Sequence, residues 1–195
     1  MARARRTEAL VVGAGPVGLF TALALDDKGI GVTIIDEQWR SAAHSYALAL
    51  HPTSLELLDS LGLADEMVAR GRRVDRMELF SGEEPKGRIS LADISSPYPF
   101  LLVLPQSEFE GAMVRSLAAR GVEVRWNHCL SRLVTTSEGI RAEVDRLAKS
   151  STGYAAAQTE WSIEKTLSYE ADFAIGADGH ASTVRSQLGI PFESF

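Results

Sequence analysis

The feature that most constrains this chain is a glycine-rich turn between an apolar strand and a helix. Residues 13–18 read GAGPVG and match the pattern G-x-G-x-x-G. Thr7–Val12 before them is a short apolar run of the β type, and Pro16 is well placed in a first helical turn. Residues 31–36, GVTIID, form a second β-branched run. Strand, turn, helix and strand predict a βαβ unit with two parallel strands.

Each glycine of this turn has a separate physical task. The first allows the tight turn, the second lets backbone approach a pyrophosphate, and the third lets helix and strand lie close together. The start of the helix then offers free N–H groups and a positive dipole end to phosphate. The cofactor-contacting residues predicted in this turn are Gly13, Gly15, Pro16, Val17 and Gly18.

A carboxylate follows at the expected distance. Asp36 ends the second predicted strand, about 20 residues beyond the turn, where an acidic side chain accepts hydrogen bonds from an adenosine ribose. Glu37, directly after it, is included in the predicted site. These residues indicate a dinucleotide, either NAD or FAD, and leave the choice between them open.

A second glycine segment lies near the end of the sequence. Residues 176–185, GADGHASTVR, follow the strand-like run DFAI and open a short helix. A carboxylate at Asp178 can contact ribose or pyrophosphate, and Gly179 permits close approach. An Asp-Gly pair alone is a common turn, so this segment gains meaning only beside the first motif.

The rest of the chain predicts short helices and strands in alternation. Ser107 and Glu110 form an S-x-x-E capping box before one helix, which ends at Gly121. The other predicted helices begin at Pro52, at Ala64 and at Ser182. The predicted strands and hairpins cover 76–94, 100–104, 122–126, 130–144, 161–169 and 171–175, with irregular structure over 37–50 and a loop over 150–159.

In this order, GAGPVG, VLPQ (residues 103–106) and GADGHASTVR resemble the flavoprotein monooxygenase family that includes the para-hydroxybenzoate and phenol hydroxylases. Residues 51–63, HPTSLELLDSLGL, are similar to the subgroup acting on phenols and polyketide aromatics. The resemblance implies an α/β fold, a Rossmann-like FAD/NAD(P)-binding three-layer ββα domain over residues 1–75 and 100–195. It also implies that residues 76–99 are the first hairpin of a β-sheet substrate domain.

The same resemblance implies the chemistry. NAD(P)H would reduce FAD, O2 would form a flavin C4a-hydroperoxide, and oxygen would pass to an electron-rich aromatic substrate. Such chemistry belongs to the flavin, so no catalytic side chain is predicted. Among family positions, Gln106 matches a glutamine near the ribityl chain, Leu130 a backbone contact to adenine, and Asp178 the acidic residue of the second motif.

The sequence departs from the family pattern in three places. Tyr46 and Ala181 stand where arginines are usual, which is expected to weaken phosphate or NAD(P)H binding, although Tyr46 can still donate one hydrogen bond. Family members also continue beyond the point matching Phe195, into more of the substrate domain and a Gly-Asp segment that faces the flavin. The incomplete sheet is expected to favour a homodimer or aggregation.

Four functions therefore remain open. The chain is expected to be a monooxygenase half needing a separate C-terminal chain, a non-catalytic or folding-impaired fragment of such an enzyme, another flavin oxidoreductase, or a plain NAD dehydrogenase. The first and third predict FAD binding, the second predicts a site too open to hold flavin, and the last predicts NADH binding without flavin. The second glycine segment speaks against the dehydrogenase.

Composition excludes other classes. A net charge of −6 argues against nucleic-acid binding, and no apolar run is long enough to span a membrane. The arginines before residue 9 resemble a signal peptide, but the glycines of the turn interrupt its apolar stretch. The single cysteine, Cys129, suits a reducing cytoplasm and is expected to be buried packing. The four histidines show no metal-ligand spacing, and no metal site or hydrolytic triad is predicted.

Overall fold

The computed structural model describes residues 4–39, 47–150 and 160–193 of the chain. It divides the chain into two compact units. The first unit combines Met1–Ser41 with Val114–Phe195, and the second is Ala42–Met113. Each unit has its own sheet or sheets.

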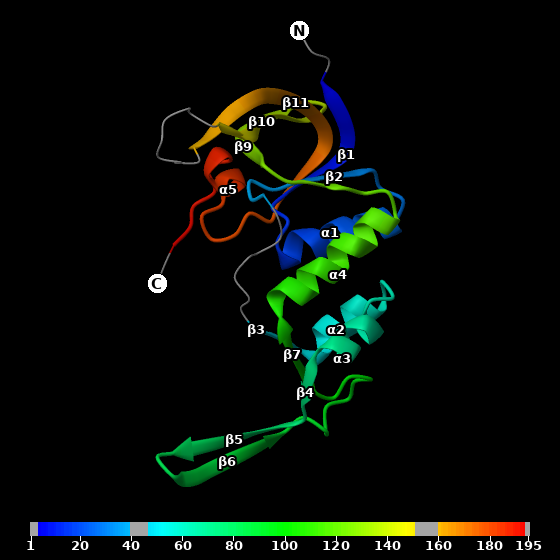
Figure 1. Ribbon diagram of the computed structural model, residues 1–195, viewed down its shortest axis with the longest axis vertical. Helices are drawn as coiled ribbons and strands as arrows, with labels where there is room; N and C mark the ends of the chain where they lie inside the picture. Colours follow the sequence, from blue (N-terminus) through cyan, green and yellow to red (C-terminus); the bar gives the residue numbers. More distant parts are fainter. Residues whose placement is uncertain (1–3, 40–46, 151–159, 194–195) are drawn as a thin grey trace. The chain divides into compact units, whose positions relative to one another are not determined.

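The first unit is built on a six-stranded sheet with the order β8-β2-β1-β11-β10-β9. Strands β8, β2, β1 and β11 run parallel, whereas β11, β10 and β9 follow one another antiparallel. Figure 1 shows helix α1 on one side of β1 and β2 and the β9–β10 hairpin on the other. The elements are β1 (Arg5–Val12), α1 (Pro16–Asp27), β2 (Val32–Ile35), β8 (Val124–Arg125), β9 (His128–Thr136), β10 (Gly139–Ser150), β11 (Glu160–Gly176) and α5 (Thr183–Gln187).

The predicted βαβ unit is confirmed. Helix α1 has Pro16 in its first turn, where a backbone N–H would have no acceptor within the helix, so the N–H that proline lacks costs no hydrogen bond. The helix ends just before Gly29, whose φ of +74° favours glycine. Leu19, Ala22 and Leu23 recur at helical spacing and are fully buried. The strand β1 pairs in parallel with β2 on one side and with β11 on the other.

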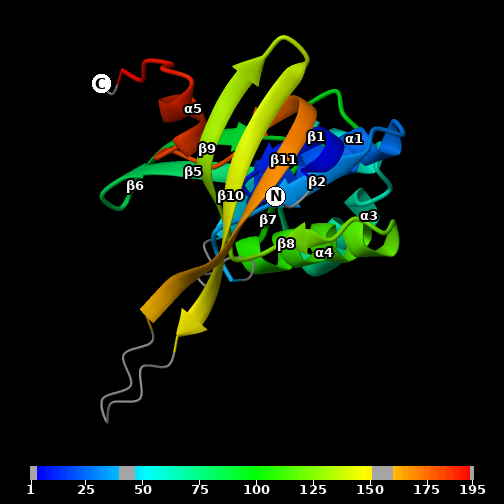
Figure 2. The ribbon, with the colours of Figure 1, turned by 90° about the horizontal axis from the view of Figure 1, so that it is seen from above.

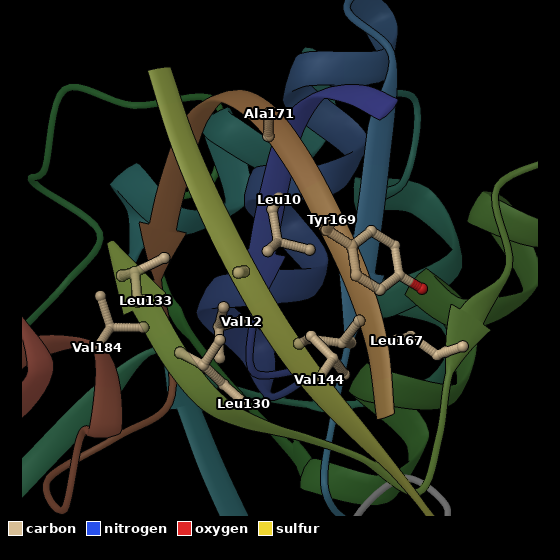
Figure 3. Close-up of a cluster of buried hydrophobic side chains, with 11 residues drawn as sticks. Leu10, Val12, Leu130, Leu133, Val144, Leu167, Tyr169, Ala171 and Val184 are labelled. Atoms are coloured by element: carbon tan, nitrogen blue, oxygen red, sulfur yellow. The ribbon is translucent and has the colours of Figure 1, made fainter. Parts of the chain in front are cut away.

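The other side of β1 and β2 is covered by the β9–β10 hairpin, which belongs to the same sheet. Side chains of β1, β2, β9, β10, β11 and α5 form one buried apolar cluster, shown in Figure 3. Burying such aliphatic side chains stabilises the fold by about 1.5–3 kcal/mol each. The cluster consists of Leu10, Val12, Ile35, Leu130, Leu133, Ala142, Val144, Leu167, Tyr169, Ala171 and Val184.

One sequence-based expectation about β11 is wrong. Residues 161–169 and 171–175 were expected to be two strands, but β11 runs unbroken over Glu160–Gly176. Its first part pairs with β10, its last part pairs with β1, and Tyr169–Ala171 pair with both. The strand changes partners without a turn, so hydropathy alone marked a false break at Glu170. Figure 2 shows β9, β10 and β11 as long neighbouring strands.

The second unit contains a three-stranded antiparallel sheet, β3-β7-β4, and a separate two-stranded hairpin, β5-β6. Helices α2 and α3 match the helices expected from Pro52 and Ala64, and the expected hairpin within 76–94 is confirmed. The elements are β3 (Ala47–Leu50), α2 (Pro52–Asp59), α3 (Ala64–Arg70), β4 (Arg72–Val74), β5 (Arg76–Ser81), β6 (Glu84–Ser90) and β7 (Leu101–Pro105). Helix α4 (Gln106–Ala119) begins in this unit and ends in the first.

Two further expectations need correction. Helix α4 begins at Gln106, so Ser107 lies inside the helix and is not its N-cap. The Glu110 carboxylate instead accepts a hydrogen bond of 2.7 Å from Gln106 Nε2, one helical turn earlier. The strand expected over residues 122–126 is reduced to Val124–Arg125, because the chain turns at Asn127.

Candidate cofactor site

A hollow of about 280 Å³ lies at the carboxyl ends of the parallel strands of the first unit. This is the edge where open α/β sheets bind ligands. The chain reaches it after β1, after β2, after β11 and at the start of β9. Its lining residues are Val12, Gly13, Gly15, Asp36, Glu37, Gln38, His128, Cys129, Leu130, Ala177, Asp178, Gly179 and Thr183.

The glycine turn is held against the segment after β11. Gly13 has a φ of +101°, and a Cβ atom there would lie 2.6 Å from the carbonyl carbon of Ala177. A Cβ atom on Gly18 would lie 2.9 Å from the carbonyl carbon of Gly13. Gly15 differs, because a Cβ atom there meets nothing within 4 Å. Gly13 and Gly18 are thus required by the fold, whereas Gly15 keeps one wall of the hollow open.

Asp36 joins the end of β2 to this turn. Its carboxylate accepts hydrogen bonds from the N–H of Ala14 at 2.6 Å and from the N–H of Gln38 at 2.7 Å. The Asp36 N–H itself donates to the Arg125 carbonyl at 3.0 Å. An ionised carboxylate has about four lone-pair sites. Two of them remain for ribose hydroxyl groups, so Asp36 can brace the turn and bind a ligand at once.

The opposite wall begins at β9 and includes residues that the sequence did not single out. The Sγ atom of Cys129 lies 3.8 Å from Glu37 Oε2, and burial, followed by the Glu37 carboxylate, raises the pKa of this thiol. The Nδ1 atom of His128 lies 2.7 Å from the Trp126 carbonyl. Burial lowers the pKa of His128, and nearby arginines lower it further, against the carbonyl contact, which raises it.

The sequence showed no metal-ligand spacing among the histidines and assigned Cys129 to buried packing. In the structure, His128 and Cys129 are half-buried and line the hollow. No spacing signal distinguished them. Their position follows from the turn at Asn127, whose N–H donates to the Gln38 carbonyl at 2.8 Å and fixes β9 beside the Asp36 segment. Gln38, Ala177 and Thr183 also line the hollow and were not among the predicted site residues.

The second glycine segment also reaches the hollow. Asp178 Oδ1 accepts a bond of 2.6 Å from the Ser182 hydroxyl, and Oδ2 accepts one of 3.0 Å from the Val184 N–H. Asp178 therefore fixes the start of α5 and presents its remaining lone pairs to the hollow. Gly179 has a φ of +77°, a conformation that favours glycine.

Of the remaining predicted site residues that the structure describes, only Leu130 lines the hollow. Leu130 is 5 % exposed and belongs to both the hollow and the apolar cluster. Pro16 and Val17 stand in the first turn of α1, and Val17 is 69 % exposed. Gln106 belongs to the second unit and donates to Glu110. Tyr46 lies outside the described residues.

This arrangement fits the adenosine and pyrophosphate part of a dinucleotide. An open wall at Gly15 and the start of a 12-residue helix suit phosphate, and carboxylates at the end of β2 suit ribose hydroxyls. A family profile described as "FAD binding domain" matches residues 6–195. The chain belongs to this family. The match supports FAD over NAD, the alternative that the glycine turn and Asp36 left open.

Relatives within the FAD-binding family are named as monooxygenases. The chain is 34% identical over 190 residues to 6-methylpretetramide 4-monooxygenase of Streptomyces rimosus, covering 94% of this chain and 30% of that protein. It matches the structure of p-nitrophenol 4-monooxygenase from Pseudomonas putida with a TM-score of 0.84 and 26% identity, over 98% of this chain and 46% of that one.

A third relative was solved with its cofactor. The flavin-dependent monooxygenase PieE, in complex with FAD and substrate, matches with a TM-score of 0.80 and 25% identity, over 100% of this chain and 34% of that one. These matches confirm the predicted fold class and the predicted resemblance. The chain spans about a third of the length of the curated relatives it matches.

None of the helices in residues 4–39, 47–150 and 160–193 is long and apolar enough to cross a membrane. Within the same residues, no group of three or more His, Cys, Asp or Glu side chains could hold a metal ion.

Proposed function

We propose that the hollow at the carboxyl edge of the first unit holds the adenosine and pyrophosphate part of FAD. We propose further that the whole protein is an NAD(P)H-dependent hydroxylase of phenolic or related aromatic rings. The observation that carries the proposal is that the glycine turn, Asp36 and the Asp178 loop meet around one hollow. Three segments distant in the sequence would not meet in this way in a simple glycine-rich loop.

The roles of the residues follow from their contacts. The first turn of α1 supplies N–H groups to the pyrophosphate, and Asp36 accepts hydrogen bonds from the ribose. Leu130 supplies an apolar wall for adenine. Asp178 holds the loop at the start of α5 in place and borders the pyrophosphate.

The bound FAD would supply the redox chemistry, with electrons from NAD(P)H and oxygen from O2. The named substrates of the relatives, 6-methylpretetramide and p-nitrophenol, support an aromatic substrate for this protein. Hydroxylation is proposed for the whole protein, since the relatives are about three times longer than the part matched here. We propose a cytoplasmic location because the chain has one cysteine and no internal disulfide.

The proposal is tested by the visible absorption spectrum after incubation with FAD and removal of free flavin. Bands near ~375 and ~450 nm, typical of bound flavin, are the expected result. Asp36→Ala should lose most of this absorbance, whereas the matched control Asp172→Ala, at an exposed ion pair with Arg6, should retain it. A colourless wild-type protein that binds NADH would contradict the proposal and favour a dehydrogenase.

The proposed hydroxylation, with its oxidation of NAD(P)H, needs a separate measurement. Co-expression with a polypeptide supplying the remaining length of a relative should give FAD-dependent NAD(P)H oxidation that increases with a phenolic substrate. Retained flavin without any such oxidation would limit the function to FAD binding. It would then support the alternative of a non-catalytic module.

A further inference from the structure

The apolar cluster of the first unit ends in a group of polar donors that the proposed FAD site does not use. Tyr169 is 1 % exposed, and its ring belongs to the cluster. Figure 3 shows its hydroxyl oxygen pointing away from Leu10 and out of the cluster. Two arginines from different strands meet this oxygen. Arg5 of β1 donates from Nη1 at 3.4 Å, and Arg125 of β8 donates from Nη1 at 3.2 Å.

The two guanidinium groups also lie over the Tyr169 ring. Their central carbons are 5.9 Å (Arg5) and 5.8 Å (Arg125) from its centroid. Contact with a ring uses the face of a guanidinium and leaves its in-plane N–H groups available. Each arginine has five such N–H donors, and the single phenol oxygen accepts only one from each.

Neither Arg5 nor Arg125 has a carboxylate partner in the described part of the chain. Among residues 4–39, 47–150 and 160–193, no carboxylate forms an ion pair with Arg5 or Arg125. A third arginine, Arg146, contributes to lowering the pKa of His128 together with these two, but it is paired with Glu164 at 2.8 Å. Within the described residues, two positive charges without an ion-pair partner therefore lie close to one phenol oxygen.

The hydroxyl hydrogen of Tyr169 is also left over. Its oxygen accepts two hydrogen bonds, and within the described part of the chain no acceptor receives its O–H. Two cationic donor groups and one neutral hydroxyl thus converge around a single phenol oxygen. A tetrahedral oxyanion has several strong acceptor oxygens and suits forked guanidinium donors.

We propose that Arg5, Arg125 and Tyr169 form a binding site for a phosphate-type oxyanion, separate from the FAD hollow. None of the three residues lines that hollow. The site takes either free phosphate or the phosphate group of a larger metabolite, since both present the same oxygens. Its ligand stabilises the junction of β1, β8 and β11 by neutralising the two arginines.

The test uses inorganic phosphate as the probe, with and without bound FAD. Phosphate should raise the melting temperature more than sodium chloride at equal ionic strength, and it should do so equally in the FAD-loaded protein. Arg125→Gln and Arg5→Gln should each weaken phosphate binding at least fivefold by titration. Tyr169→Phe, which keeps the ring, should weaken it about two- to threefold, consistent with one lost neutral hydrogen bond.

The matched control is Arg88→Gln, which removes an arginine paired with Glu78 on the β5–β6 hairpin and should change nothing. Arg5 is exposed, so Arg5→Gln is expected to fold even if Arg125→Gln does not. A phosphate ester such as glycerol phosphate distinguishes the two sources by binding more tightly than free phosphate if a larger metabolite is the ligand. The proposal is overturned if chloride or acetate stabilises as well as phosphate. It is equally overturned if FAD abolishes phosphate binding, or if Arg5→Gln behaves like Arg88→Gln.

Discussion

Strands β1 and β5 have similar lengths and both contain apolar side chains, yet their surroundings differ completely. The last four residues of β1 are buried, and β1 pairs with strands on both sides. Every residue of β5 and β6 is exposed, including Leu79 at 54 % and Phe80 at 57 %. The β5–β6 ladder is a two-stranded sheet by itself.

This difference shows that forming a strand and stabilising the fold are separate matters. An isolated two-stranded hairpin is marginal in water, because it buries too little apolar surface to offset its ordering entropy. The β1 region combines strand pairing, helix α1 and the covering β9–β10 hairpin. We therefore expect substitutions around β1 and the cofactor hollow to change stability and FAD binding, and equivalent changes in β5 and β6 to have little effect.

The largest effect is expected at the turn after β1. Gly13→Ala forces a side chain onto a φ of +101° and into the backbone of Ala177. Strain and overlap together should lower the free energy of unfolding by about 3–5 kcal/mol and abolish FAD retention. Urea unfolding followed by circular dichroism, with flavin absorbance, measures both.

Gly15→Ala is the matched control for that change. Its φ is −74°, and its Cβ atom meets nothing within 4 Å. Stability should therefore stay within about 0.5 kcal/mol of wild type, while FAD affinity falls because the new methyl group enters the hollow. Equal destabilisation by Gly13→Ala and Gly15→Ala would refute the assignment of separate tasks to these two glycines.

The second prediction compares one leucine from each region. Leu10→Ala empties a fully buried position in the cluster and should cost about 2–5 kcal/mol of unfolding free energy. Leu79→Ala removes a side chain that is 54 % exposed and should cost less than about 0.5 kcal/mol. Chemical denaturation of the two variants in parallel gives the answer. A cost for Leu79→Ala close to that for Leu10→Ala would mean that β5 is covered in solution.

The third prediction concerns the loop after β11. Asp178→Ala removes the acceptor for the Ser182 hydroxyl and the Val184 N–H, which together fix the start of α5. Loss of this capping should cost about 1–2 kcal/mol and weaken FAD binding by loosening one wall of the hollow. Asp172→Ala, at an exposed salt bridge, should be nearly neutral by the same thermal and flavin-binding assays. Similar losses in both variants would exclude a specific role for Asp178.

The same contrast explains which parts the sequence could predict. The βαβ unit was predictable because its signals are local: an apolar strand, glycines with fixed spacing, Pro16 and a terminal Asp36. The starts of α1, α2 and α3 were predictable for the same reason, from the prolines at residues 16 and 52 and from helical spacing.

The wrong or missing parts depend on distant neighbours. The single strand β11 exists because β10 and β1 offer consecutive pairing partners, which no local pattern reveals. His128 and Cys129 reach the hollow only because the turn at Asn127 is bonded to the carbonyl of Gln38, about 90 residues earlier. A resemblance identified Asp178, but its bonds to Ser182 and Val184 came from the structure alone.

The smallest predicted effect tests the thiol at the cofactor hollow against a thiol on the hairpin. Burial first, and then the Glu37 carboxylate, raises the pKa of Cys129, so at pH 8 it holds less of the reactive thiolate than a free cysteine does. Its alkylation should therefore be slow, rise as the pH increases above 8, and become a few-fold faster in Glu37→Gln. FAD should slow it further because Cys129 lines the hollow. The control is Ser81→Cys in a Cys129→Ala background, an exposed position in β5 that should react faster and ignore FAD. Equal alkylation rates for the two thiols at pH 8, or protection of both by FAD, would contradict the claim that the hollow specifically slows the reaction of Cys129.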